Sequence, residues 1–535
     1  METFPLTLML LAAVTLLAIA ARRVHLPYPT VMVLGGLAIS VIPGLPHVAT
    51  NPELLLVLFL PPLLYAGAWF TSWRDFRANL RPISMLAVGF VVFTTVAIAW
   101  AAHALIPAMS WPAAFALGAI VSPPDAVAAV AILGRLGVPN RVVTILEGES
   151  LVNDATGLIL YRVAVAAAVT GAFSLPVAAM QLVLMSAGGV VAGLALGWLV
   201  AQVHRRLDDP LTETVITLLT PYVVYLAAER VHVSGVLAVV TCGLYVSRRS
   251  HQLFSAGTRL QANGVWATFV FLLNGLVFVL IGLQLPMIME ANPGYTARQL
   301  AWYVLAISAL VFVVRFVWVF PVAYLSRLLV PHLRRTEPPP RWQNVLIVAY
   351  TAMRGVVSLA AALALPTVTL SGAPFPQRGL VIFLTFCVIL ATLVGQSLTL
   401  PLLIRALRLR PDDAEHCEEW EARVRAADAA LEHLRAVVQT SPAPDEHVVR
   451  ELQDRYLARV SRLAGCQGDE DEDAASAEDR TNGADADGGL RRLLREALEI
   501  ERRTIIDLRD RDVISDAVLR RIERDLDLEA LRLES

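Results

Sequence analysis

Residues 112–134 read PAAFALGAIVSPPDAVAAVAILG, an apolar stretch that two adjacent prolines divide near its middle. Its length is sufficient to cross a bilayer, because a spanning helix needs about 20 apolar residues. Pro123 and Pro124 remove two helix N–H donors and clash with the preceding turn, so the helix must break there. Broken backbone at bilayer depth is tolerated only where it lines a cavity or packs within protein. The stretch therefore predicts a membrane protein in which other helices surround a discontinuous one.

The same apolar character recurs along the first three quarters of the chain, and we expect an all-α polytopic membrane protein with about thirteen transmembrane helices. If spans 1–6 and 8–13 are two inverted repeats, the fifth and twelfth runs occupy equivalent places. Discontinuous helices in both runs would then cross near the middle of the membrane. The predicted runs are 4–20, 28–44, 52–70, 83–105, 112–134, 142–169, 176–203, 212–229, 232–247, 264–288, 299–329, 342–366 and 379–404.

Charge divides the chain into two parts. Residues 1–410 contain 13 acidic residues and 25 Arg, residues 411–535 contain 33 acidic residues and 19 Arg, and there is no Lys. We therefore predict a transmembrane domain over 1–410 and a charged, cytosolic helical tail over 411–535. Within the tail, 411–460 and 490–535 have the apolar spacing of amphipathic helices. The acidic linker near 467–489 is predicted to be disordered. The tail is either a solvated appendage or a module that binds a regulator or itself.

Arginine placement predicts the orientation of the spans. Alternate connections, beginning after the first run, contain 19 Arg, whereas the other connections contain only Arg230, Arg298 and Arg378. Positively charged connections favour the cytoplasmic side of a membrane. The sequence thus predicts a multi-pass protein of the plasma (inner) membrane, with the N-terminus outside and the C-terminal tail in the cytoplasm.

Ionisable residues inside the runs mark candidate functional positions, because they are expensive within a bilayer. The richest segment is Glu147-Gly148-Glu149-Ser150-Leu151-Val152-Asn153-Asp154. On a helix, Ser150 and Asp154 share a face, and Asn153 adds an amide beside them. Oxygen ligands of this kind suit a hard cation such as Na⁺, and the same carboxylate can hold a proton instead. Asp154 is therefore predicted to be the group for which a cation and a proton compete.

Three further charged residues have alternative interpretations. Asp125 either contributes to the same site or caps the half-helix that follows the prolines. Arg354, in the twelfth run, is predicted to pair with Glu149, either as a structural pair or as part of the transport machinery. Arg162 is predicted to pair with Asp154 or with Glu147, and Arg315 is interpreted as structural.

In ordered combination, four stretches of the chain resemble the monovalent cation/proton antiporter family, in its electroneutral sodium/proton exchanger branch. The resemblance covers about residues 1–405. The stretches are Ser122-Pro123-Pro124-Asp125-Ala126-Val127-Ala128, the segment Glu147 to Asp154, Phe271-Leu272-Leu273-Asn274-Gly275-Leu276 with Ile281-Gly282-Leu283-Gln284, and Arg354-Gly355.

The resemblance implies thirteen spans with an inverted repeat, a homodimer, and a core domain that moves against a dimerisation domain. It implies that Asp154 carries the ion and the proton, with Asn153 and Ser150 beside it, and that Glu149 pairs with Arg354. Asn rather than a second Asp at position 153 is similar to the electroneutral branch.

The chain departs from the family at three positions. Ala66 stands where some relatives have Glu, Pro124 stands where many have Thr, and Ala126 stands where many have Pro. Ser122 or backbone oxygens are then expected to complete the ligand set, and Na⁺, Li⁺ and K⁺ all remain candidate cargo. We expect no cofactor, no structural metal and no nucleic acid; the expected partners are the lipid bilayer and a second copy of the chain.

Other classes of function fit the sequence less well. No HExxH, GxSxG or P-loop pattern occurs, and we expect no enzyme. A cation channel would need acidic rings along an open pore, whereas the runs hold single buried charges. The sequence therefore favours a secondary antiporter that exchanges Na⁺ or another monovalent cation for H⁺ by alternating access at Asp154.

Overall fold

The computed structural model describes residues 3–24, 26–42, 52–107, 109–134, 136–290, 294–329, 339–370, 372–409, 413–440 and 488–534. In this part of the chain the regular structure is helical, apart from one isolated antiparallel bridge between Val368 and Pro374. The chain forms two compact units. The membrane unit comprises Met1–Thr71, Phe76–Leu253 and Ala262–Pro411, and the tail unit comprises Ser72–Asp75, Phe254–Gln261 and Asp412–Ser535.

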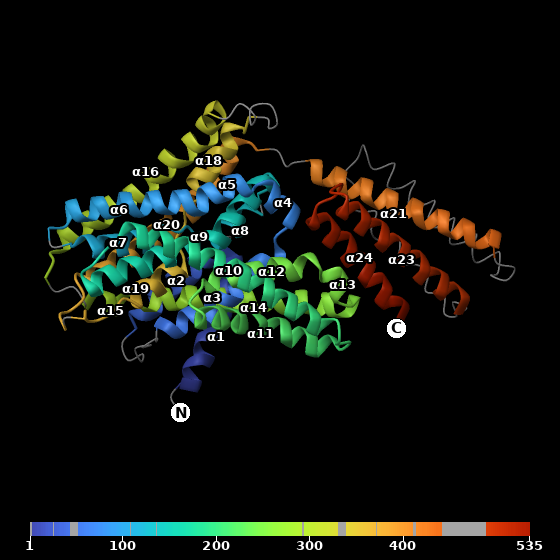
Figure 1. Ribbon diagram of the computed structural model, residues 1–535, viewed down its shortest axis with the longest axis horizontal. Coiled ribbons are helices and arrows are strands. Elements are labelled where there is room, and N and C mark those ends of the chain that lie inside the picture. The colour runs from blue at the N-terminus through green and yellow to red at the C-terminus, as the bar shows by residue number, and fades with distance from the viewer. Residues whose placement is uncertain are drawn as a thin grey trace. The chain divides into compact units, whose positions relative to one another are not determined.

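Each of the thirteen predicted runs corresponds to a helix or to an interrupted helix (Figure 1), which confirms the all-α membrane fold. Seven helical segments among the described residues are long and apolar enough to cross a bilayer. They are Leu80–Leu105 (α5 Leu80–Ser84, the π-helical turn η1 Met85–Phe90 and α6 Val91–Leu105), α9 Asn140–Thr170, α10 Leu175–His204, α11 Pro210–Arg230, α14 Ala256–Leu283, α16 Ala297–Leu329 and α20 Arg378–Leu407.

The remaining runs form further helices, two of them interrupted, and three short helices lie between the runs. The helices of these runs are α1 Thr3–Val24, α2 Tyr28–Ser40, α3 Pro52–Phe70, α7 Trp111–Val121, α8 Val127–Leu133, α12 Gly235–Arg248, α18 Trp342–Tyr350 and α19 Val356–Leu363. The connecting helices are α4 Trp73–Ala78, α13 Ser250–Leu253 and α15 Leu285–Glu290.

Both predicted interruptions are present. The fifth run ends as a helix at Val121 and resumes at Val127, and the twelfth ends at Tyr350 and resumes at Val356. The second break contains no proline. It is held open by side chains of α20, because Gln396 accepts a bond from the Ala352 N–H (3.0 Å) and Thr392 accepts one from the Arg354 N–H (3.2 Å). Backbone donors that the helix loses are thus satisfied by a neighbouring helix.

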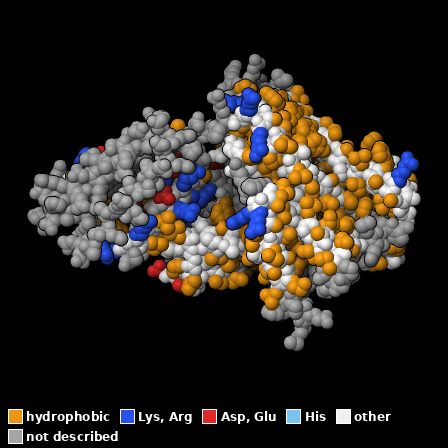
Figure 2. Space-filling model, turned by 180° about the vertical axis from the view of Figure 1, so that it is seen from behind, with side chains coloured by type: hydrophobic (Ala, Val, Ile, Leu, Met, Phe, Trp, Pro, Cys, Tyr) orange, Lys and Arg blue, Asp and Glu red, His pale blue; other side chains and the backbone are white. Residues whose placement is uncertain are grey.

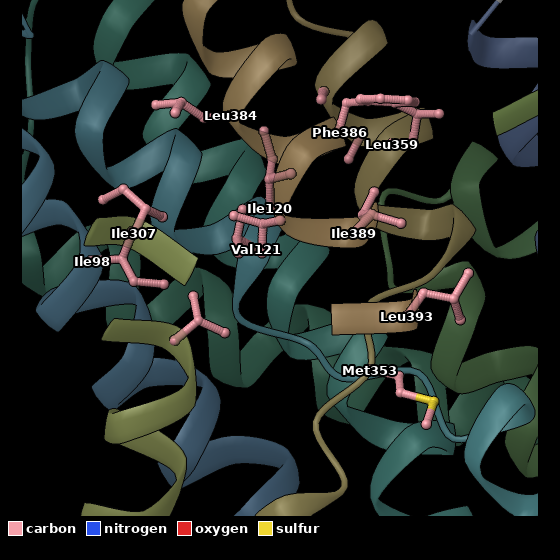
Figure 3. Close-up of a cluster of buried hydrophobic side chains, with 14 of the residues drawn as sticks. Ile98, Ile120, Val121, Ile307, Met353, Leu359, Leu384, Phe386, Ile389 and Leu393 are labelled. Atoms are coloured by element: carbon pink, nitrogen blue, oxygen red, sulfur yellow. The ribbon is translucent and has the colours of Figure 1, made fainter. Parts of the chain in front are cut away.

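The broken helices contribute to a large buried apolar cluster of the membrane unit. Residues from α7, α16, α19 and α20 contribute to one continuous cluster of buried apolar side chains, part of which Figure 3 shows. The labelled side chains are Ile98, Ile120, Val121, Ile307, Met353, Leu359, Leu384, Phe386, Ile389 and Leu393. Close packing on this scale fixes the ends of the half-helices relative to one another.

Small residues bring α10 and α12 into backbone contact, as the glycine spacing in α10 predicts. A Cβ at Gly193 would lie 2.5 Å from the Ala238 carbonyl oxygen, and one at Gly189 would lie 2.7 Å from the Ser234 carbonyl oxygen. The opposite face of α10 carries exposed apolar side chains such as Trp198, which is 54% exposed. Figure 2 shows that hydrophobic side chains cover much of one face of the membrane unit, as expected for a surface solvated by lipid.

The tail unit contains three long helices that contact one another, α21 Asp413–Thr440, α23 Gly488–Asp510 and α24 Asp516–Glu534 (Figure 1). Their apolar faces form buried clusters that include Leu498, Val518 and Leu526. The predicted linker lies outside the described residues over 467–487, and Gly488 and Gly489 belong to α23.

The range 490–535, predicted to be amphipathic and helical, contains two helices with a turn between them. Asp512 adopts a left-handed conformation with φ 58°. The Val513 N–H bonds to the Leu508 carbonyl (2.9 Å) and the Asp512 N–H bonds to the Arg509 carbonyl (2.9 Å). This bond pattern closes the C-terminus of α23, with an Asp where a glycine is usual.

The glycine contact between α10 and α12 can be tested with a matched pair of substitutions. Gly193→Val should lower the apparent melting temperature in detergent, since overpacking of a tight contact costs about 1–3 kcal/mol. Gly264→Val in α14 is the control, because nothing lies within 4 Å of a Cβ built at that position. Equal melting temperatures for the two variants would contradict the proposed role of Gly193.

Candidate functional site

A cavity of about 380 Å³ lies within the membrane unit, beside both broken helices. Its walls are mainly apolar and come from α3, α8, α9, α14 and α19. Polar side chains are few in this lining and include Asp125, Glu147, Ser150, Asp154 and Asn274. Carboxylates in an apolar cavity at bilayer depth are the usual mark of an ion or proton pathway.

Asp154 and Ser150 both line this cavity from one face of α9, as their spacing predicts. The Ser150 hydroxyl accepts a hydrogen bond from the Ala126 N–H across 3.3 Å, which ties α9 to the start of α8. Within the described part of the chain, Asp154 makes no hydrogen bond or ion pair with another residue. Its carboxylate oxygens are therefore available to a ligand in the cavity.

Asp125 lies between the two breaks and joins them. Its N–H donates to the Met353 carbonyl across 2.7 Å, and its carboxylate accepts a bond from the Val127 N–H across 2.8 Å. It also faces Gly355, where a Cβ would overlap the Asp125 carboxylate. Its carboxylate therefore satisfies the first N–H of α8, just before the N-cap residue Ala126, and it also lines the cavity.

Asn153 and Ser122 are buried beside the cavity and are absent from its described lining. The Asn153 side-chain amide donates to the Pro124 carbonyl across 2.6 Å, while its Oδ1 accepts no bond from the described residues. The Ser122 hydroxyl donates to the Ala119 carbonyl and accepts a bond from Thr95, each across 3.2 Å. These two predicted ligands therefore brace the first break, and the structure does not bring their side chains into the cavity with Asp154.

The predicted ion pair between Glu149 and Arg354 is not formed. Glu149 instead pairs with Arg315 of α16 in a bidentate arrangement, one bond of which spans 2.7 Å. Both side chains are almost fully buried, and the Arg315 guanidinium lies 4.8 Å from the centre of the Phe90 ring. Arg315 also donates to the Val348 carbonyl (3.1 and 3.2 Å), in the last turn of α18. The residue interpreted only as structural is therefore the partner of Glu149.

Arg354 binds backbone carbonyls rather than a carboxylate. Its Nε donates to the Val121 carbonyl across 2.9 Å, and its other nitrogens donate to the carbonyls of Ala352 and Ser122. Val121 ends α7, where the prolines leave carbonyls without helical partners. The C-terminal end of a helix carries a partial negative charge, so a guanidinium is well placed there. The broken helix supplies the acceptors that the sequence interpretation assigned to Glu149.

Arg162 also has a different partner from those predicted. It pairs with Glu229 of α11 across 2.8 Å, and Glu229 in turn accepts a bond from the Gly235 N–H across 3.2 Å. The Arg162 side chain is 41% exposed, so the pair lies near the surface. Asp154 and Glu147 are consequently not neutralised by this arginine.

Sequence reasoning missed Arg315 as a partner and Gln396 and Thr392 as supports of the second break. The available signal was their spacing, because Thr392 and Gln396 are polar, four residues apart, in an otherwise apolar run. Asn274 was noticed only as part of the family resemblance, and it lines the cavity.

Removal of one partner from the buried pair should be far more costly than the same change near the surface. Glu149→Gln leaves Arg315 uncompensated in a dry environment, which costs about 3–5 kcal/mol. Arg162→Gln breaks a partly exposed pair worth about 1 kcal/mol or less. Thermal unfolding of the two variants in detergent checks the difference, and similar shifts in melting temperature would contradict it.

The chain has relatives among known proteins, both in sequence and in fold. A model of the transmembrane sodium/hydrogen exchanger family matches residues 9–406. An uncharacterized Na(+)/H(+) exchanger of Mycobacterium tuberculosis is 36% identical over 98% of this chain and 95% of its own length. A Na(+)/H(+) antiporter of Aphanothece halophytica is 33% identical over 80% of this chain and 79% of its own. A sodium, potassium, lithium and rubidium/H(+) antiporter of Bacillus pumilus is 38% identical over 82% of this chain and 66% of its own.

The fold is also similar to solved structures of the sodium proton antiporter from Methanocaldococcus jannaschii. Two of them align with TM-scores of 0.56 and 0.60, at 18% and 19% identity, and cover 76% and 77% of this chain and 99% of theirs. The sequence matches confirm the family resemblance and the prediction that this protein is a transporter rather than an enzyme. The chain belongs to the sodium/hydrogen exchanger family.

Proposed function

We propose that the protein exchanges Na⁺, or another monovalent cation, for H⁺ at the carboxylate of Asp154. The observation that carries this proposal is that Asp154 lines the cavity without a protein partner among the described residues. A carboxylate in this setting binds either a cation or a proton, because either one neutralises its buried charge. The Bacillus pumilus relative is named for four different cations, which leaves Na⁺, Li⁺ and K⁺ as candidate cargo for this chain.

The ligand set that we propose is centred on three residues. Asp154, Ser150 and Asp125 line the cavity from two elements that meet at the first break. Their oxygens are the hard ligands that alkali cations prefer. Asn153 and Ser122 act on the same site by holding the Ser122–Ala126 segment in place, with Pro124 and Ala119 as their bonding partners. Ala66 also lines the cavity and supplies no ligand from its side chain.

We propose that exchange is electroneutral and proceeds by alternating access. The buried Glu149–Arg315 pair is internally neutral, and Asp125 and Arg354 at the two breaks carry opposite charges, so a single exchangeable positive charge at Asp154 is sufficient for each half of the cycle. The carboxylate then crosses the membrane barrier in a neutral form, with one cation or with one proton. A charged empty carboxylate would be much more costly to move through a region of low dielectric.

The arginine pattern supports a topology in which the N-terminus is outside and the tail is cytoplasmic, in the plasma (inner) membrane. The family resemblance further supports a homodimer with a core that moves against a dimerisation domain. The exposed apolar side chains of α10 are compatible with contact either to lipid or to a second copy of the chain.

Loss of the Asp154 carboxylate should abolish exchange. In proteoliposomes that contain a pH-sensitive dye, a Na⁺ pulse should change the internal pH for the wild type and for Asp208→Asn. The rate of this pH change should be at least about 100-fold lower for Asp154→Asn. A neutral amide has no charge that a cation or a proton could neutralise. Asp208 is the matched control, since it is an exposed aspartate in a connection between helices. Wild-type rates in Asp154→Asn would overturn the proposal.

Electroneutral exchange makes a separate prediction. A Na⁺ pulse should shift the pH dye without a matching response from a voltage-sensitive dye in the same vesicles, because one positive charge moves in each direction. The pulse is repeated with a Na⁺ salt whose counter-ion cannot cross the membrane. A voltage that still develops together with the pH change would show another stoichiometry.

A further inference from the structure

The tail unit contains more than the C-terminal helices. Two short segments from between the membrane runs, Ser72–Asp75 and Phe254–Gln261, belong to the same compact unit as residues 412–535. The second of these segments includes Arg259, in the first turns of α14. Arg259 has only 8% of its surface exposed, although its sequence context is a polar connection. A buried arginine needs fixed acceptors, and the tail helices provide them.

Arg259 is held by two acidic residues of α24. Its Nε donates to Asp527 across 2.9 Å, and a second nitrogen donates to the other oxygen of the same carboxylate. Glu523 lies 3.6 Å from the guanidinium, and the Phe254 carbonyl accepts a further bond across 2.8 Å. Asp527 and Glu523 are 2% and 4% exposed. The bidentate geometry is the strongest way to bind a guanidinium and discriminates against lysine.

Arg259 is one of several arginines around these two carboxylates. Asp527 also accepts a bond from Arg502 of α23 across 2.7 Å, and Arg502 and Arg509 both act on Glu523. Burial raises the pKa of Glu523, while the nearby arginines, first among them Arg259, oppose that shift. Without Arg259, Glu523 would lose the arginine that acts on it most strongly and Asp527 would lose its bidentate partner, and removal of one partner from a buried ion pair is strongly destabilising.

The first segment has its own contact with the tail helices. Asp516, at the start of α24, accepts bonds from the Ser72 hydroxyl and from the Arg74 N–H, each across 3.3 Å. The Arg74 side chain also lies 3.5 Å from Glu418 of α21. Two separate segments of the chain therefore contact α24. Ser72–Asp75 contacts it at Asp516, and Phe254–Gln261 contacts it further along, at Glu523 and Asp527.

We propose that the tail helices recognise the guanidinium of Arg259 in the acidic pocket of Glu523 and Asp527, and that this contact couples the tail to transport through α14. The second half of the proposal rests on the proposed antiport. The physical link is α14 itself, which carries Arg259 near its start and, further along, Asn274 in the wall of the cavity. At about 1.5 Å per residue, the two positions are about 22 Å apart along one continuous helix. A change that binds or frees the Arg259 side chain therefore acts on α14, which also lines the cavity.

The docking half is tested by hydrogen exchange of α24 in the full-length protein. Arg259→Gln should accelerate backbone exchange in α24 at least tenfold, because one buried carboxylate loses its counter-charge. The double variant Arg259→Gln with Glu523→Gln restores the balance and should return exchange most of the way to the wild-type rate. Arg492→Gln is the control, since Arg492 pairs with Glu496 on an exposed part of α23, with 82% of its side chain accessible. Unchanged exchange in Arg259→Gln, or strictly additive effects in the double variant, would overturn the docking.

The coupling half is tested by transport in the same variants. Arg259→Gln should change the Na⁺ concentration for half-maximal exchange or the maximal rate by threefold or more, with recovery in the double variant and no change in Arg492→Gln. Transport equal to wild type in Arg259→Gln, in the presence of faster α24 exchange, would refute the coupling while the docking stands. If the wild type shows no cation-driven proton movement at all, the proposed antiport fails, and the hydrogen-exchange result still decides the docking.

Discussion

The membrane unit depends on how it satisfies the free carbonyl groups at the ends of two broken helices. α7 and α18 both stop within the membrane unit, and each stop leaves carbonyls without intrahelical partners. Arg354 donates to the end of α7, and Arg315 donates to the last turn of α18. Each guanidinium offers several donors in a fixed plane and meets the negative end of a helix dipole. The two buried arginines thus have the same physical task at the two breaks.

This constraint explains why the carboxylates have different environments. Arg315 retains enough donors to hold Glu149 as well as Val348, so Glu149 is fully engaged. Arg354 is occupied by carbonyls, and Arg162 is engaged by Glu229. Asp154 therefore lies in a mainly apolar cavity with no arginine partner among the residues that the structure describes, which is the condition under which mobile cations can compete for it. The site is therefore defined by which groups the arginines bind, rather than by how many carboxylates are present.

Local sequence rules predicted the elements well and the long-range partners poorly. Length and hydropathy located the spans, prolines located the first break, and helical spacing placed Ser150 and Asp154 on one face. The partner of Glu149 was not predictable in the same way, because two arginines in apolar runs were equally available and spacing says nothing about distance between helices. The second break has no proline, so only the expected symmetry indicated it. Asp512, just after α23, has the left-handed conformation that a glycine usually adopts at the end of a helix.

The contact between Gly355 and Asp125 links two positions that lie far apart in the chain. A side chain at 355 would occupy the space of the Asp125 carboxylate, and the Asp125 N–H is bonded to the Met353 carbonyl in the same interruption between α18 and α19. Substitution at either position therefore changes what the other can be. In related sequences, the residues at positions 355 and 125 are expected to vary together. A larger side chain at 355 would require either a smaller residue at 125 or a shift of the backbone between α18 and α19. Redesign of ion preference at Asp125 must accordingly treat the pair as one unit.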